Sequence, residues 1–118
     1  SMGDDVEQCM MPIRANMALY IGGMGARDKN FYNNYAKALG FEDAAVKIQD
    51  LFLAGRKDEA AAAVPAELID ACHLVGPAER IKERLQRWKT AGNHGQVASM
   101  LLGCRQPEAL EVIAGEVL

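Results

Sequence analysis

Apolar residues recur at helical spacing along most of the chain, in stretches that glycine and proline separate. The clearest stretch runs from Pro77 to Ala91. Within it Ile81, Leu85 and Trp88 fall at i, i+4 and i+7, while charged residues cover the other faces. Proline at the start and Gly92 after the end are typical of helix boundaries. The pattern predicts an amphipathic helix that packs through one apolar stripe.

The same reasoning predicts further helices over Pro12–Tyr20, Asp28–Leu39, Glu42–Ala54 and Arg56–Val64, and from Gln106 to the end of the chain. Another helix is predicted to start within Val64–Glu67 and to carry Leu68, Cys72 and Val75 at helical spacing. The first has an apolar stripe that begins near Val6 and that Pro12 interrupts. That helix therefore either kinks at Pro12 or begins anew near Met11. Gly40 and Gly55 are expected to end the second and the third helix.

Two stretches depart from the helical pattern. Ile21–Arg27 holds three glycines in four positions and is expected to form a hinge or loop between helices. Val97–Leu102 is a short apolar run bounded by Gly95 and Gly103, which makes it the best strand candidate in the chain. The chain is therefore predicted to be mainly α, with six to seven helices and at most one or two short strands.

Length and charge limit the classes of protein to consider. A chain of 118 residues is expected to form one compact domain. Thirteen basic and sixteen acidic residues, with no long basic cluster, argue against nucleic-acid binding. No apolar run approaches the roughly 20 residues that cross a membrane, and three widely spaced cysteines favour reduced thiols in the cytoplasm. Ser1–Gly3 look like a cloning remnant, so the domain is expected to span residues 4–118.

The glycine-rich stretch is the main candidate for ligand binding. Gly22, Gly23 and Gly25 would let backbone N–H groups approach a phosphate or the anionic tail of a coenzyme, and Arg27 and Lys29 lie nearby. The spacing matches neither the P-loop nor the dinucleotide-binding fingerprint. A flexible hinge between helices is the alternative interpretation of the same residues.

The sequence assigns no metal site and no catalytic residue. Cys72, His73, His94 and Cys104 are metal-ligand types, but their spacing fits no zinc motif. Adjacent residues of a helix point about 100° apart, so Cys72 and His73 are not expected to form a nucleophilic pair.

Two long stretches resemble one family of enzymes. The first, from Val64 to Gly92, reads VPAELIDACHLVGPAERIKERLQRWKTAG. It is similar to the late segment of luciferase-like, deazaflavin-dependent oxidoreductases of the bacterial luciferase superfamily. The second, from Leu19 to Pro65, reads LYIGGMGARDKNFYNNYAKALGFEDAAVKIQDLFLAGRKDEAAAAVP and resembles the same group. The similarity thus extends over most of residues 4–118.

The resemblance implies a (β/α) TIM-type barrel, of which this chain would be the carboxyl-terminal part, because a complete barrel needs roughly 250 residues. It also implies hydride transfer between a cofactor and a small organic substrate. The cofactor would be the deazaflavin coenzyme F420 or, as the alternative, flavin mononucleotide (FMN). The chain alone is expected to be inactive and to hold no bound cofactor.

A freestanding helical protein-interaction domain is the alternative function, suggested by the hairpin of Asp28–Leu39 and Glu42–Ala54. No second copy of this hairpin occurs in the sequence, whereas repeat arrays need at least about three units. Two assemblies are open, a compact monomer whose helices close on each other and a homodimer, and the homodimer is favoured because a second copy would pair the backbone of the predicted strand Val97–Leu102. The stripes on Ile81, Leu85 and Trp88 and on Leu110, Ile113 and Val117 would cover barrel strands that this chain lacks, so another surface must cover them.

Overall fold

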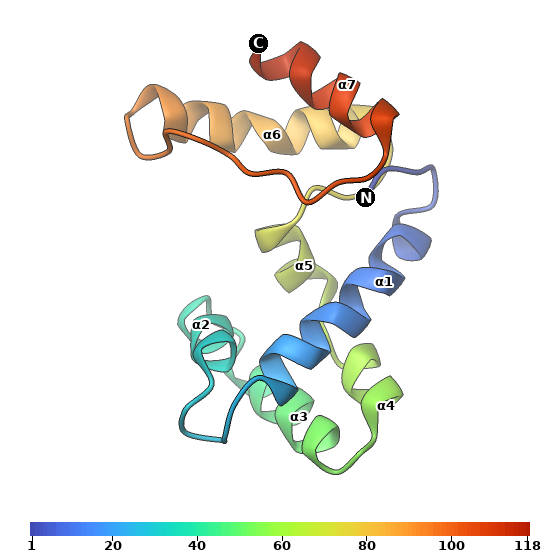
Figure 1. The fold of residues 1–118 in the computed structure, drawn as a ribbon, viewed down its shortest axis with the longest axis vertical. Coiled ribbons are helices and arrows are strands. Elements are labelled where there is room, and N and C mark those ends of the chain that lie inside the picture. Colours follow the sequence, from blue (N-terminus) through green and yellow to red (C-terminus); the bar gives the residue numbers. More distant parts are fainter. The chain divides into compact units, whose positions relative to one another are not determined.

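The computed structural model describes residues 1–118 and contains seven α-helices and one π-helix (Figure 1). The elements are α1 (Val6–Ala18), η1 (Leu19–Gly23), α2 (Phe31–Ala38), α3 (Glu42–Leu53), α4 (Lys57–Ala62), α5 (Ala66–Cys72), α6 (Ala78–Asn93) and α7 (Pro107–Val117). One isolated parallel β-bridge joins Met2 to Gly76. The predicted mainly helical fold class is confirmed.

The chain divides into two compact units. The central unit comprises Met10–Cys72, and the split unit comprises Ser1–Cys9 together with His73–Leu118. The boundary between them falls within α1 and again after α5. Each unit has its own buried apolar residues and is described separately.

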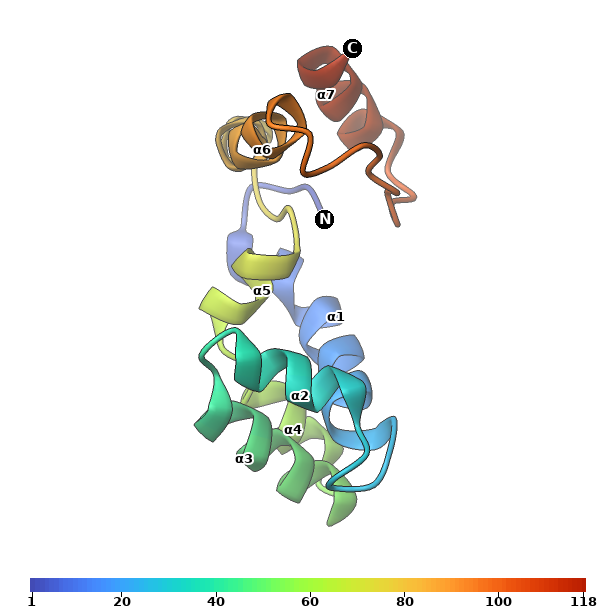
Figure 2. The same ribbon diagram turned by 90° about the vertical axis from the view of Figure 1, so that its left-hand side faces the viewer.

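In the central unit α3 packs against η1, α2 and α4 (Figure 2). Ala45 and Ile48 of α3 are fully buried, and Ala60 of α4 is too. The helix predicted over Arg56–Val64 is present as α4, which is shorter than predicted. Its small side chains let two helices approach closely, so little bulk is needed to bury the interface.

Glycine ends the helices of this unit as the sequence predicts. After α2, Gly40 adopts a φ of +94°, its N–H donates to the carbonyl of Lys37, and the N–H of Phe41 donates to the carbonyl of Ala36. These two bonds form a Schellman motif, which satisfies carbonyl groups that the helix leaves without partners. The same arrangement follows α3 at Gly55.

Two predicted helix starts are wrong. Pro12 does not restart the first helix near Met11, because α1 runs unbroken from Val6 to Ala18 with the exposed Pro12 inside it. The second helix begins at Phe31 rather than at Asp28. Asn30 is its cap, and its side chain accepts a hydrogen bond from the N–H of Asn33. Asn and Asp are similarly good caps, so the sequence did not distinguish the two positions.

In the split unit α6 and α7 pack together around a buried cluster of Ile81, Leu85 and Ile113. The predicted end of α6 at Gly92 is wrong, because the helix continues to Asn93. Gly95, with a φ of +70°, closes it through a bond from Gln96 to Ala91. The helix therefore includes Gly92 at an energetic cost of about 1 kcal/mol relative to alanine.

The strand predicted at Val97–Leu102 is also wrong, because this segment is neither helical nor paired with another strand. A strand needs a neighbouring backbone for its N–H and C=O groups, and none lies beside it in this chain. The predicted apolar stripe of the last helix is only partly buried. Ile113 lies inside and is joined by Ala109, while Leu110 and Val117 remain exposed.

Candidate functional site

Two of the three glycines of the candidate ligand loop, Gly22 and Gly23, pack against Phe52 of α3. Gly22 and Gly23 lie in η1, and a Cβ atom at Gly22 would lie 2.5 Å from the Cβ atom of Phe52. A Cβ atom at Gly23 would lie 2.4 Å from Cε1 of the same ring. Both distances are shorter than any non-bonded carbon contact allows. Close helix packing therefore accounts for the absence of side chains at these two positions.

The third glycine closes the turn after η1. A Cβ atom at Gly25 would lie 2.5 Å from the carbonyl oxygen of Lys29, and the N–H of Lys29 donates to the carbonyl of Ala26 at 3.0 Å. The segment between η1 and α2 is thus a tight turn rather than an open loop.

Two buried asparagines, which the sequence pattern does not single out, fix this turn by hydrogen bonds. Asn30 Nδ2 donates to the carbonyl oxygens of Tyr20 (3.1 Å) and Ile21 (3.0 Å). Asn33 Nδ2 donates to the carbonyl oxygens of Ile21 (3.1 Å) and Ala45 (2.8 Å). Both side chains are fully buried. The π-helix leaves carbonyl groups near its end without helical partners, and the asparagine amides satisfy them. The only signal in the sequence is the density of asparagines after the glycines.

The cation expected to bind an anion is paired within the chain. Arg27 donates through Nη1 to Oδ1 of Asp50 on α3, and the two side chains are 61% and 52% exposed. An exposed pair of this kind contributes about 0–1 kcal/mol. Arg27 could therefore exchange Asp50 for a stronger anion at small cost. The structure thus brings Gly22, Gly23, Gly25 and Arg27 together at one end of α3, and a ligand contact by them stays a prediction.

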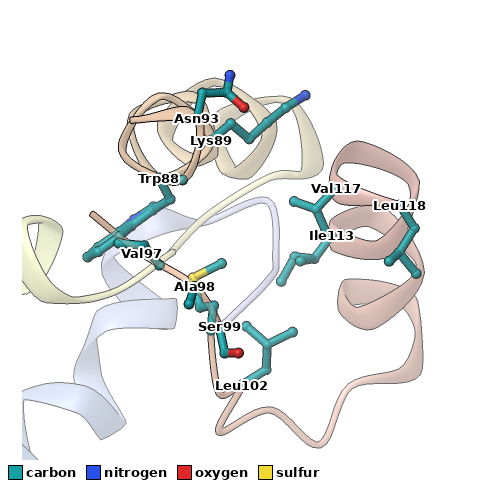
Figure 3. Close-up of a pocket in the computed structure, with 12 residues that line it drawn as sticks. Trp88, Lys89, Asn93, Val97, Ala98, Ser99, Leu102, Ile113, Val117 and Leu118 are labelled. Carbon is teal, nitrogen blue, oxygen red and sulfur yellow. The ribbon is translucent and has the colours of Figure 1, made fainter. Parts of the chain in front are cut away.

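A pocket of about 550 Å³ lies in the split unit between α6, the segment 97–102 and α7 (Figure 3). Trp88 and Val97 line one side, and Ile113 and Val117 line the other. Lys89 belongs to its lining and lies 3.7 Å from Glu116. The lining is mostly apolar, and Lys89 is its only charged side chain.

The residues considered as metal ligands do not form a cluster. No group of three or more histidine, cysteine, aspartate or glutamate side chains in the chain is arranged to hold a metal ion. Cys72 ends α5, His94 caps α6 and Cys104 precedes α7. None of the helices is long and apolar enough to span a membrane.

Comparison with known proteins gives two matches. The model of a family described as luciferase-like monooxygenase matches residues 1–95. A protein of Mycobacterium tuberculosis that carries the provisional name coenzyme F420-dependent oxidoreductase is 36% identical over 89 residues, which cover 75% of this chain. The chain spans 26% of the length of that relative. No solved structure matches the chain.

Proposed function

The chain belongs to the luciferase-like monooxygenase family, and from this premise we propose that it serves an enzyme that transfers a hydride between coenzyme F420 and a small organic substrate. The family has a TIM-type barrel fold, and the helices described here are part of such a barrel. The observation that carries the proposal is the 36% identity, over three quarters of the chain, to a protein named for coenzyme F420. FMN is the alternative cofactor. The family match favours this enzyme over a freestanding helical interaction domain.

We further propose that the isolated chain does not turn over substrate. Barrel enzymes build their active sites from loops at the carboxyl ends of the strands. This chain has no strand, and its pocket is mostly apolar. The cofactor supplies the redox chemistry when it is bound, while the protein supplies orientation and exclusion of water. Cytoplasmic localisation is proposed with the enzyme.

Cofactor titration tests both statements. The whole protein is expected to bind coenzyme F420 saturably and more tightly than FMN, measured by cofactor absorbance or fluorescence. The isolated chain is expected to show no binding in the submicromolar range for either cofactor. Tight binding by the isolated chain would contradict its proposed inactivity. If the whole protein bound FMN but not coenzyme F420, the cofactor would be the flavin rather than the deazaflavin.

The turn between η1 and α2 is proposed to contact the anionic tail of the cofactor. Its support is the cation of Arg27 beside Gly25, the weak pairing of Arg27 with Asp50, and the frequent occurrence of π-helical turns at functional sites. Because Phe52 covers Gly22 and Gly23, their backbone N–H groups would not surround the anion. These glycines would instead allow the close packing that positions the turn.

A pair of arginine variants tests this contact in the whole protein. Arg27→Ala is expected to weaken cofactor binding by about tenfold, the usual effect of losing a charged hydrogen bond. Arg56→Ala is the matched control, because Arg56 is also exposed and also pairs with a carboxylate, Glu59. Equal effects of the two variants would refute the contact but would leave the family-level proposal intact if the cofactor still binds.

A further inference from the structure

The first three residues lie in an extended conformation beside Leu74–Gly76, and hydrogen bonds hold their backbone on both sides. On one side, the Ser1 nitrogen donates to the carbonyl of Leu74 at 2.8 Å and the N–H of Gly76 donates to the carbonyl of Ser1 at 3.0 Å. The N–H of Gly3 donates back to the carbonyl of Gly76 at 3.1 Å. These bonds alternate as they do in a parallel β-ladder.

On the other side of the segment, the side chain of Gln106 makes the hydrogen bonds that a second neighbouring strand would make. Oε1 of Gln106 accepts from the N–H of Met2 at 2.8 Å, and Nε2 of Gln106 donates to the carbonyl of Met2 at 2.9 Å. The primary amide thus binds both polar groups of one residue. Gln106 is the N-cap position of α7, so the start of that helix fixes the position of the amide.

Side-chain contacts add selectivity at two positions. The Met2 side chain packs against the cluster of Ile81, Leu85 and Ile113, which favours an apolar residue there. At the next position, a Cβ atom on Gly3 would lie 2.8 Å from Sγ of Cys9, which favours a small residue. The hydrogen bonds described above all involve the main chain of the bound segment.

We propose that Leu74, Gly76, Gln106 and the Ile81–Leu85–Ile113 cluster form a binding site for an extended peptide segment, here named the backbone seat. Its ligand runs parallel to Leu74–Gly76 and has an apolar residue followed by a small one. Main-chain recognition of an added strand is tolerant of sequence, with pockets for individual side chains giving what selectivity there is. The seat is independent of the proposed enzymatic function.

The full chain carries the test, with its own segment weakened by Met2→Asp. This change puts a carboxylate against the apolar cluster and should empty the seat. The readout is amide hydrogen exchange by NMR. We expect the Gly76 amide to exchange about tenfold faster or more, while the Ile81 amide, which bonds to the carbonyl of Pro77 at the start of α6, stays protected. Met11→Asp is the matched control, because Met11 is 63% exposed and its replacement should leave Gly76 unchanged.

A peptide added to the Met2→Asp chain then tests binding directly. The pentapeptide Ser-Met-Gly-Asp-Asp should restore protection of the Gly76 amide at roughly millimolar concentration, the range set by the tethered segment it replaces. Ser-Asp-Gly-Asp-Asp should not, and adding Gln106→Ala to the chain should abolish the restoration. No restoration, or equal restoration by both peptides, would overturn the proposal. If Met2→Asp also exposes the Ile81 amide, the peptides are added to the milder variant Met2→Ser instead. Restoration of Gly76 protection by the methionine peptide alone then supports the proposal, and no restoration or equal restoration overturns it.

Discussion

Gly22 and Phe52 approach so closely that a single methyl group between them would overlap the Phe52 side chain. The added Cβ atom would lie 2.5 Å from Cβ and 2.8 Å from Cγ of Phe52, and 3.2 Å from the carbonyl oxygen of Ile48. The Phe52 Cβ is fixed to the α3 backbone and cannot swing away. Gly22→Ala is therefore expected to lower the free energy of unfolding by about 1–3 kcal/mol, measured by urea denaturation.

Gly115→Ala is the control for that substitution. Gly115 lies inside α7, and a Cβ atom there would meet no atom within 4 Å. Alanine should stabilise the chain by about 0.4–1 kcal/mol because it restricts the unfolded state. Similar destabilisation by both changes would show that the contact with Phe52 is not what selects glycine at position 22.

Asn33→Ala should destabilise the central unit by about 2–3 kcal/mol. The change leaves the buried carbonyl groups of Ile21 and Ala45 without the bonds that Asn33 now donates. Asn33→Asp should cost more, because a carboxylate cannot donate and would face two carbonyl oxygens. Thermal unfolding monitored by circular dichroism measures both.

Asn34→Ala is the companion control in the same helix. Asn34 is exposed in α2, and alanine has the higher helix propensity, so stability should be unchanged or slightly higher. If Asn34→Ala lowered the stability as much as Asn33→Ala, any substitution in α2 would be destabilising. The effect of Asn33→Ala could then not be assigned to its two donated hydrogen bonds.

The pair of Arg56 and Glu59 at the start of α4 makes a small part of the stability depend on pH. The hydrogen bond from Arg56 lowers the pKa of Glu59 below its usual value of 4.5. A carboxyl group whose folded pKa is depressed stabilises the fold above its unfolded pKa, and the contribution disappears as pH falls through the folded value. Glu59→Gln should therefore be less stable than the native chain at neutral pH and equal to it once the pH lies well below 4.5.

Salt provides a second check on this pair. Both side chains are more than half exposed, so screening should shrink the difference at neutral pH as ionic strength rises. Glu83→Gln, at an exposed position of α6, is the control. A difference between native and Glu59→Gln chains that persists below the folded pKa would contradict the assignment to charge.

Assembly is the fourth prediction. Leu101 is 97% exposed, Leu102 and Val117 are also exposed, and the segment Val97–Leu102 has no strand partner. Covering several hundred Å² of such surface would contribute several kcal/mol at about 25 cal/mol per Å². We expect a homodimer through this surface of the split unit, seen by light scattering over a dilution series. Leu101→Asp should shift the population to monomer, whereas Leu53→Asp, at an exposed leucine of the central unit, should not. A monomeric mass at the highest concentration would refute the dimer.

Local signals in the sequence predicted most of the helices. Gly40 and Gly55 follow apolar periodic runs, and both end helices by the predicted motif. Local signals failed where two residues offered the same chemistry. Gly92 and Gly95 can each end α6, and only the latter supplies the bonds to the last turn. The strand predicted at Val97–Leu102 failed because a strand requires a neighbouring backbone, which no local pattern reports.

The candidate site was predicted only as a position in the chain. The sequence places three glycines and Arg27 in one short stretch, but Phe52 and Asp50 determine what those residues contact, and both lie more than 20 residues away. The amide of Asn33 bonds to carbonyl groups 12 residues away in both directions along the chain. Contacts between distant residues of this kind become visible only when the helices are placed in space.

The division into two units has a practical consequence for spectroscopy. The only tryptophan, Trp88, belongs to the split unit, while the three tyrosines, Tyr20, Tyr32 and Tyr35, all belong to the central unit. Tryptophan emission, excited beyond the tyrosine absorption band, therefore reports the split unit, and the tyrosine bands of the second-derivative absorbance spectrum report the central unit. If the two signals change at the same denaturant concentration, the chain unfolds in one cooperative step, and if they separate, an intermediate with one folded unit exists.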